Sequence, residues 1–171
     1  GQSVWLDYIQ RSFITSGALQ RLIIEEGVAG VTSNPVIFEK AITQSSDYAD
    51  ALSLLRKEPR LDAKACFERL AIDDIQSAAD LLQPVYARTN RRDGYVSLEV
   101  SPLVAHDTQG TIQEATRLWE AVGRDNLMIK VPATRAGIPA TEQLMSMGIN
   151  FNVATATAEV EAAAVSTDDQ A

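Results

Sequence analysis

The sequence predicts an α/β fold in which short strands alternate with helices and close into a (β/α)8 TIM barrel. Short apolar runs alternate with stretches of helical spacing, which indicates parallel βα units with right-handed crossovers. Polar residues lie at or near the C-terminal end of five successive predicted strands, where barrel enzymes place their chemistry. These residues are Asp7, Asn34, Glu99, Lys130 and Asn152.

An open, doubly wound sheet is the alternative arrangement of such units. Its dinucleotide-binding form needs a glycine-rich turn after the first strand, and the segment that begins at Asp7 contains no glycine there. Each polar strand-end residue also has a purely structural interpretation. Asp7 can cap a helix, Asn34 can form a turn, and Glu99 can pair with a cation. Five such residues at equivalent places favour the barrel.

The individual elements follow from apolar spacing and from turn residues. Apolar runs bounded by Gly, Pro or Asn predict strands, and apolar residues three or four apart predict helices. Pro84 lies inside the longest helical pattern and predicts a kink or break there. The predicted strands span residues 3–7, 28–33, 95–100, 126–134 and 149–153, and the predicted helices span 18–26, 47–56, 61–88, 108–122 and 137–148.

Composition narrows the class of protein. A chain of 171 residues that is 46% hydrophobic and 22% charged is globular and long enough for a core. A net charge of -8 argues against nucleic acid or an anionic membrane as partner, but not against a small phosphorylated substrate. The single cysteine, Cys66, excludes an internal disulfide and fits a reducing, cytoplasmic location. No apolar run is long enough to span a bilayer.

Lys130 differs from the other three lysines because it lies inside an apolar strand pattern. Burial disfavours the charged ammonium, and a neutral amine can attack a carbonyl carbon. The alternative is a lysine that extends its ammonium from the strand end to water. His106, the only histidine, is predicted to be a solvated loop residue. The single histidine and the single cysteine lie far apart in the sequence and do not have the spacing of metal ligands. We therefore expect no metal, and we expect no cofactor.

Five motifs, one at each predicted strand, resemble those of the transaldolase family. The resemblance covers roughly residues 4–153 and points to the bacterial branch with long chains. The motif that contains Asn34 and the motif that contains Lys130 occur together at corresponding places, and this combination is specific to that family. The motifs are Val4-Trp-Leu-Asp7, Gly30-Val-Thr-Ser-Asn-Pro35, Val96-Ser-Leu-Glu-Val100, Met128-Ile-Lys-Val-Pro-Ala-Thr134 and Gly148-Ile-Asn-Phe-Asn-Val153.

The resemblance implies a class I aldolase barrel that transfers a dihydroxyacetone unit between sugar phosphates in the pentose phosphate pathway. The donor would be fructose 6-phosphate or sedoheptulose 7-phosphate, and the acceptor an aldose phosphate. Lys130 would form the Schiff base, Glu99 would relay protons through a water, and Asp7 would act as acid/base. Asn34 and Asn152 would bind donor hydroxyls, and no metal would be needed.

The chain departs from the family pattern after Asn152. Ala154 stands where the family has a threonine, and residues 154–171 form an Ala/Thr-rich segment in which a short helix is expected over 158–165. We therefore expect a barrel portion at 1–153, with about five of eight strands, and a separate tail at 154–171. The family resemblance implies that the arginines that bind the substrate phosphate belong to the last three barrel strands, which this sequence does not contain. Of the arginines in this sequence, Arg135 is the candidate for binding the phosphate.

Three explanations can account for a sequence that contains only about five of the eight strands of a barrel. The sequence can be an incomplete record of a longer chain, a truncated chain whose sheet edges pair in a homo-oligomer, or a chain with a misread C-terminal region. Two other functions stay open beside transaldolase. One is a non-catalytic module that acts by association. The other is cleavage without transfer, as in short fructose 6-phosphate aldolases, which the long helical segment 61–88 disfavours.

Overall fold

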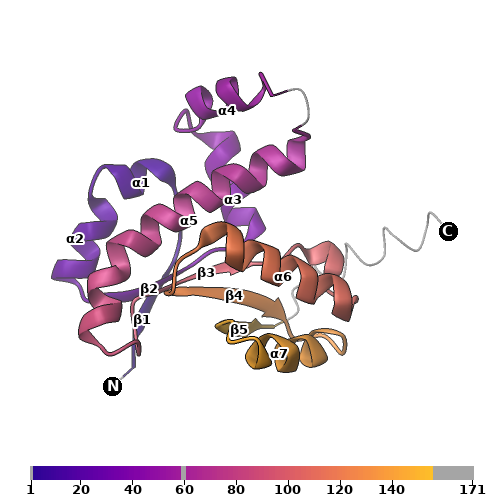
Figure 1. The fold of residues 1–171 in the computed structure, drawn as a ribbon. Helices are drawn as coiled ribbons and strands as arrows, with labels where there is room; N and C mark the ends of the chain where they lie inside the picture. Colours follow the sequence, from indigo (N-terminus) through magenta and orange to yellow (C-terminus); the bar gives the residue numbers. More distant parts are fainter. Residues whose placement is uncertain (1, 59–60, 156–171) are drawn as a thin grey trace. The chain divides into compact units, whose positions relative to one another are not determined.

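The computed structural model describes residues 2–58 and 61–155. Its strands form one sheet in the order β1-β2-β3-β4-β5, and the β1/β2 and β4/β5 pairs are parallel (Figure 1). A strand order equal to the chain order, with helices between the strands, matches the first part of a (β/α)8 barrel. The predicted fold class is confirmed to that extent. The strands are β1 (Val4–Asp7), β2 (Val28–Thr32), β3 (Tyr95–Glu99), β4 (Leu127–Pro132) and β5 (Phe151–Ala154).

Five of the α-helices were predicted, with ends that differ by a few residues. Two were not predicted, namely α1 (Arg11–Thr15) and α3 (Pro35–Gln44). A 3-10 turn, η1 (Pro102–Val104), follows β3. The predicted helices are α2 (Ala18–Glu25), α4 (Ala49–Leu55), α5 (Ala63–Arg88), α6 (Thr108–Val122) and α7 (Gly137–Ser146). The helix expected over 158–165 lies outside the described residues.

Of the kink or break predicted at Pro84, the break does not occur, because α5 continues through this residue to Arg88. Proline removes one backbone hydrogen bond to the carbonyl four residues earlier. Pro84 lies on the exposed face of the helix, whereas Leu82, Val85 and Tyr86 are buried. Water can hydrate a carbonyl on that face, and the buried neighbours hold the helix in place.

The chain divides into two compact units. The first comprises the chain up to Val96 together with Arg124–Asn126, and the second comprises Ser97–Gly123 and the chain from Leu127 onward. In the first unit, α1 and α2 both contact α5 (Figure 1). A small core of Ala41, Tyr48, Leu55 and Leu70 joins α3, α4 and the start of α5.

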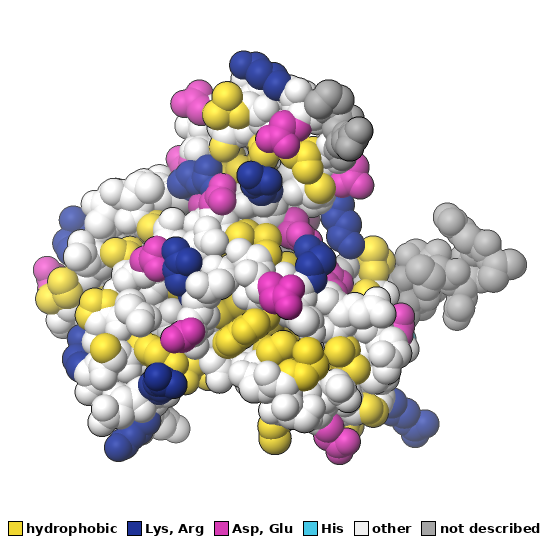
Figure 2. Space-filling view, in the orientation of Figure 1, with side chains coloured by type: hydrophobic (Ala, Val, Ile, Leu, Met, Phe, Trp, Pro, Cys, Tyr) yellow, Lys and Arg dark blue, Asp and Glu magenta, His cyan; other side chains and the backbone are white. Residues whose placement is uncertain are grey.

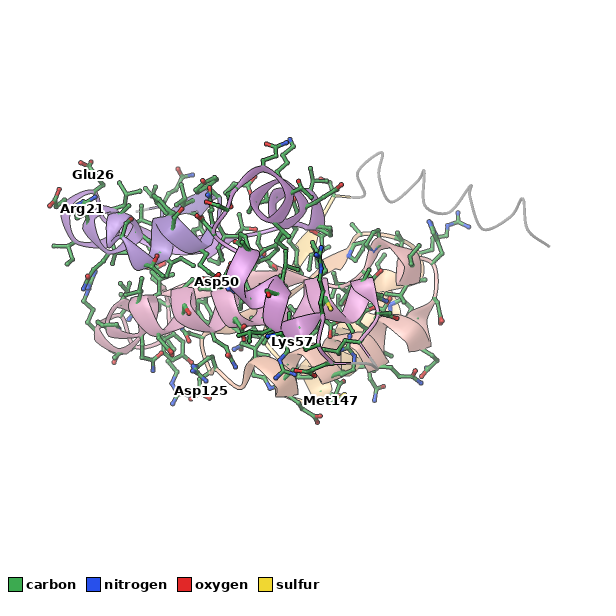
Figure 3. All side chains as sticks on the ribbon, turned by 90° about the horizontal axis from the view of Figure 1, so that it is seen from above. Arg21, Glu26, Asp50, Lys57, Asp125 and Met147 are labelled. Atoms are coloured by element: carbon green, nitrogen blue, oxygen red, sulfur yellow. The ribbon has the colours of Figure 1, made fainter. Side chains whose placement is uncertain are left out.

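The helix α2 shows how apolar spacing places a helix on this unit. Leu19 and Ile23 are four residues apart and buried, as expected of one helical face. Arg21, within α2, and Glu26, directly after it, are both exposed (both labelled in Figure 3). The apolar face therefore packs against the unit while the charged face meets water.

A buried polar cluster fastens α1 to α5 in the first unit. The Tyr48 hydroxyl donates to Asp74 Oδ2 at 2.7 Å and accepts from the Arg11 backbone N–H at 3.1 Å. The Arg11 side chain reaches Asp74 Oδ1 at 2.8 Å and lies over the Tyr48 ring. Burial raises the pKa of Asp74, although its bonds from Tyr48 and Arg11 act the other way. Burial, with the hydrogen bond to Asp74, also raises the pKa of Tyr48.

In β2, Gly30 allows close packing against Trp5 of β1. The two residues are in register, and a Cβ on Gly30 would lie 2.4 Å from the Trp5 ring. Only glycine leaves room for the indole at this place. Trp5 is half-buried by this packing.

The second unit is built on β4 and β5, with α6 and α7 side by side (Figure 1). Leu127, Ile129 and Val131 are buried and alternate along β4 with Met128 and Lys130. This period of two gives β4 one apolar face, and both α6 and α7 contact the strand. Lys130 therefore projects from the opposite face.

The surface carries charges of both signs. On the face shown in Figure 2, Lys and Arg side chains are interspersed with Asp and Glu side chains. Among residues 2–58 and 61–155, no helix combines the length and the apolar character needed to cross a membrane.

Candidate active site

An ion pair between β4 and β3 forms the centre of the candidate site. Lys130 Nζ lies 3.0 Å from Glu99 Oε2, and the two side chains are only 16% and 12% exposed. An enclosed lysine needs an opposite charge because removing an ammonium from water is costly. Glu99 provides this charge and lies within reach to accept a proton from the amine.

The strands hold these two side chains on one face. The backbone N–H of Val100 donates to the carbonyl of Lys130 at 3.2 Å, so the end of β3 lies beside the middle of β4. Leu98 in β3 and Val100 directly after it are buried on the face opposite Glu99. A rigid pair of neighbouring strands thus positions the amine and the carboxylate.

Asn152 lies next to this pair on β5. It is the Cα partner of Lys130 in the parallel β4/β5 register, so both side chains project from the same face. Its Nδ2 donates to the Ser97 hydroxyl at 2.9 Å. Its Oδ1 is buried and has no hydrogen-bond partner among the described residues. The structure therefore brings together three predicted site residues, Glu99, Lys130 and Asn152.

The loops that follow β3 and β4 are tied together just beyond these residues. The buried Thr134 hydroxyl donates to the Ala105 carbonyl and accepts from the Gly137 N–H at 2.9 Å. The Thr108 hydroxyl donates to the carbonyl of Ala136 at 2.8 Å. A Cβ on Gly137 would lie 2.1 Å from the Pro132 carbonyl oxygen, so the chain turns tightly there. These contacts fix the strand ends that carry Glu99 and Lys130.

Asp7 and Asn34 belong to the first unit. Asp7 is the last residue of β1, is exposed, and is in register with Thr32 of β2. Asn34 follows β2 and caps α3, because its Oδ1 accepts from the Ile37 N–H at 2.9 Å. Both residues therefore lie at the C-terminal end of the β1/β2 pair.

A hollow of about 330 Å³ lies on the same unit, next to the end of β1. The charged and amide groups along it are Lys40, Gln10 and Gln44, and the Tyr8 hydroxyl donates to Gln10. Gln10 also donates to Asp47 at 2.9 Å. Hydrogen bonds from Ser12 and Gln10 hold the pKa of Asp47 below its usual value.

The remaining sequence candidates lie in loops of the second unit. Arg135 is exposed between β4 and α7, and His106 is exposed after η1, as predicted for a loop histidine. Cys66, in contrast, lies on α5 of the first unit, where it is partly buried and packs against the small core of Ala41, Tyr48, Leu55 and Leu70. Over the described ranges, no three His, Cys, Asp or Glu side chains are grouped as metal ligands.

Sequence reasoning missed Ser97 at this site. Ser97 is fully buried on β3 and precedes Glu99 by two residues, which puts both side chains on one face. The signal was a polar residue in a strand that is otherwise apolar up to the candidate acid, which follows two positions later. Asn152, in contrast, was found because it closes its own strand motif.

Comparison with known proteins places the chain in a family. The sequence model of the family described as transaldolase/fructose-6-phosphate aldolase matches residues 4–167. The chain is 52% identical over 153 residues to a transaldolase of Thiobacillus denitrificans, a match that covers 90% of this chain and 42% of that protein. It is 49% identical over 154 residues to transaldolase 2 of a Nostoc species, covering 90% of this chain and 40% of the relative.

A more distant bacterial relative shows the same coverage. A transaldolase of Mycobacterium ulcerans is 45% identical over 153 residues, which are 90% of this chain and 41% of that protein. The chain thus spans less than half the length of these relatives. The family match extends over nearly all of the chain, including the strands that carry Lys130, Glu99 and Asn152, and this chain therefore belongs to the transaldolase/fructose-6-phosphate aldolase family.

Proposed function

We propose that this chain carries the donor half of a transaldolase reaction and that Lys130 forms a Schiff base with a ketose phosphate. The observation that supports the proposal is the Lys130–Glu99 pair, 3.0 Å apart and largely enclosed, with Asn152 on the same face. A largely enclosed amine beside a carboxylate that can accept its proton suits a lysine that must become neutral before it attacks a carbonyl.

The proposed chemistry begins with attack of the neutral Lys130 amine on the carbonyl carbon of the donor. Glu99 holds the proton that leaves the amine, and a proton returned to the carbinolamine oxygen lets it depart as water. The resulting iminium accepts the electron pair of the neighbouring carbon–carbon bond when that bond breaks. An aldose phosphate leaves, and a dihydroxyacetone unit stays on the lysine as an enamine. Addition of this enamine to a second aldose phosphate completes the transfer.

Three further residues have proposed roles that rest on the family resemblance of their motifs. Asp7 would take the proton of the donor hydroxyl whose carbon–carbon bond breaks. Asn34 would use its amide nitrogen on a donor hydroxyl, because its oxygen already caps α3. Arg135 is the candidate for the substrate phosphate, since it is exposed and follows the lysine strand.

The donor would be fructose 6-phosphate or sedoheptulose 7-phosphate, which places the reaction in the pentose phosphate pathway. A cytoplasmic location suits these substrates and a chain with one cysteine.

A burst experiment distinguishes the candidate reactions. Fructose 6-phosphate is mixed with the chain, first without an acceptor, and the release of glyceraldehyde 3-phosphate is followed. Transaldolase chemistry predicts one stoichiometric burst, followed by sustained turnover to sedoheptulose 7-phosphate once erythrose 4-phosphate is added. Sustained release of free dihydroxyacetone without an acceptor would indicate an aldolase instead. The absence of any burst from folded protein would contradict both reactions and leave the non-catalytic module.

Two lysine variants make the result specific to the proposed residue. Lys130→Met should abolish the burst, whereas Lys57→Met should leave it unchanged, because Lys57 is an exposed lysine after α4 (labelled in Figure 3). A burst that survives in Lys130→Met would refute the role of Lys130.

A further inference from the structure

The orientation of the Asn152 side chain raises a question that its family motif does not answer. An asparagine amide presents two donor hydrogens on one side and an acceptor oxygen on the other. In this structure the nitrogen faces Ser97, at 2.9 Å from its hydroxyl oxygen. The oxygen is buried and, within the described part of the chain, has no partner.

A buried acceptor without a partner is unusual, because most buried polar atoms form hydrogen bonds. Such an atom destabilises the free protein and is satisfied when a ligand brings a donor. The register places this oxygen on the face of β5 that carries Asn152 beside Lys130. A hydroxyl group on a molecule bound to Lys130 is the donor that suits it.

Ser97 is placed to choose this orientation. It lies on the same face of β3 as Glu99 and is completely enclosed. Its hydroxyl oxygen accepts the Asn152 N–H, which directs the carbonyl oxygen of the amide away from Ser97. Removal of the Ser97 hydroxyl would take away the acceptor that holds the amide nitrogen on this side.

We propose that Ser97 is a positioning residue that fixes the Asn152 amide so that its carbonyl oxygen receives an α-hydroxyl of the ketone bound to Lys130. The inference rests on the proposed function, since it needs a ketone at Lys130. Ser97 itself need not touch the substrate. Its effect is selectivity for ketones that carry a hydroxyl on the carbon next to the carbonyl.

Two small ketones that differ in one hydroxyl test this selectivity. Hydroxyacetone carries the α-hydroxyl and acetone lacks it. The chain is incubated with each ketone and borohydride, and the rate of adduct formation on Lys130 is measured by peptide mass spectrometry. The ratio of the two rates is compared between variants, which removes the intrinsic difference in reactivity between the ketones.

Ser97→Ala should lower the hydroxyacetone-to-acetone ratio about fivefold, the value of one hydrogen bond between neutral groups. Ser97→Cys keeps a side chain of the same shape at this position, so no cavity is left, but its sulfur is a weak acceptor and should lower the ratio. Ser101→Ala is the matched control, because this serine caps η1 after β3 and should leave the ratio unchanged.

A double variant shows whether Ser97 acts through Asn152. Asn152→Ala should lower the ratio by itself, and Ser97→Ala should add nothing in that background. A purely structural Ser97 would slow the trapping of both ketones equally and keep the ratio constant, which would overturn the inference.

The trapping experiment gives one result if the proposed function is wrong and a different result if only this inference is wrong. If the unmodified chain forms no adduct on Lys130 with either ketone, the proposed function fails and this inference fails with it. If the unmodified chain forms adducts but the ratio is the same in Ser97→Ala and Ser97→Cys, only the inference is wrong.

Discussion

At the residue scale, the environment of Lys130 separates it from the other lysines of the chain. Lys40, Lys57 and Lys64 are exposed, whereas the Lys130 side chain is 16% exposed and paired with Glu99. A largely enclosed pair of this kind contributes little to stability, because desolvation offsets much of the attraction between the charges. Its cost is easier to understand if the pair serves chemistry.

Asn34 has two separable tasks, and two substitutions distinguish them. Asn34→Asp keeps an oxygen that can cap α3 but loses the amide N–H. We expect it to retain the stability of the native chain and to lose the burst with fructose 6-phosphate. Asn34→Ala loses the cap as well and should lower the free energy of unfolding by about 1 kcal/mol.

Urea unfolding and the burst assay together check this expectation. Full burst activity in Asn34→Asp would show that the amide nitrogen does not bind substrate and that Asn34 is only a cap.

The polar strand-end residues could be found from the sequence because each follows an apolar run. Lys130, Glu99 and Asn152 were predicted to lie close together, and the structure places them so. Ser97 is visible in the sequence as a polar residue in an apolar strand, but its partner Asn152 could not be assigned, because it lies 55 residues away in sequence. Hydrogen bonds between distant side chains leave no local pattern.

At the element scale, the short helices escaped prediction for different reasons. The helix α1 has five residues, too few to show helical periodicity. The helix α3 had a clear start signal, an Asn cap followed by proline at the first helical position, which sequence analysis interpreted as the end of a strand. Long-range contacts decide the rest, as the cluster of Arg11, Tyr48 and Asp74 shows.

Removing the Tyr48 hydroxyl tests this cluster. Tyr48→Phe leaves the Arg11 backbone N–H and one Asp74 oxygen without their partner in a buried place. We expect the free energy of unfolding to fall by about 1–3 kcal/mol. Tyr8→Phe, at a residue 40% exposed, is the control and should change it by less than about 0.5 kcal/mol. Equal effects in urea unfolding would mean that the cluster does not hold α1 to α5.

At the scale of the whole molecule, the predicted alternation of strands and helices is confirmed, and the sheet order follows the chain order. Apolar periodicity was sufficient for this because βα units are local in sequence. The prediction that these units belong to a barrel rested on the polar residues at the strand ends and on the family motifs. The break at Pro84 was mispredicted because tertiary packing of α5 outweighs the local cost of proline.

The buried Asp74 makes stability depend on pH. Burial raises its pKa in the folded chain above the value of about 4 in the unfolded chain, so the folded state binds the proton more tightly. The stability due to this group is fully present below the unfolded value and is lost as pH rises through the raised folded value. Asp74→Asn cannot ionise and should flatten this part of the curve. Urea unfolding measured from about pH 4 upward checks it, and an unchanged slope in the variant would exclude Asp74 as the cause.

The central claim is that Lys130 is a nucleophile, and borohydride trapping with fructose 6-phosphate tests it most directly. The chain is incubated with the sugar and the reductant, digested, and mapped by peptide mass spectrometry, while circular dichroism confirms that it is folded. The account predicts a reduced dihydroxyacetone adduct on Lys130 and none on Lys40, Lys57 or Lys64. A folded chain without an adduct, or with the adduct on another lysine, would contradict it.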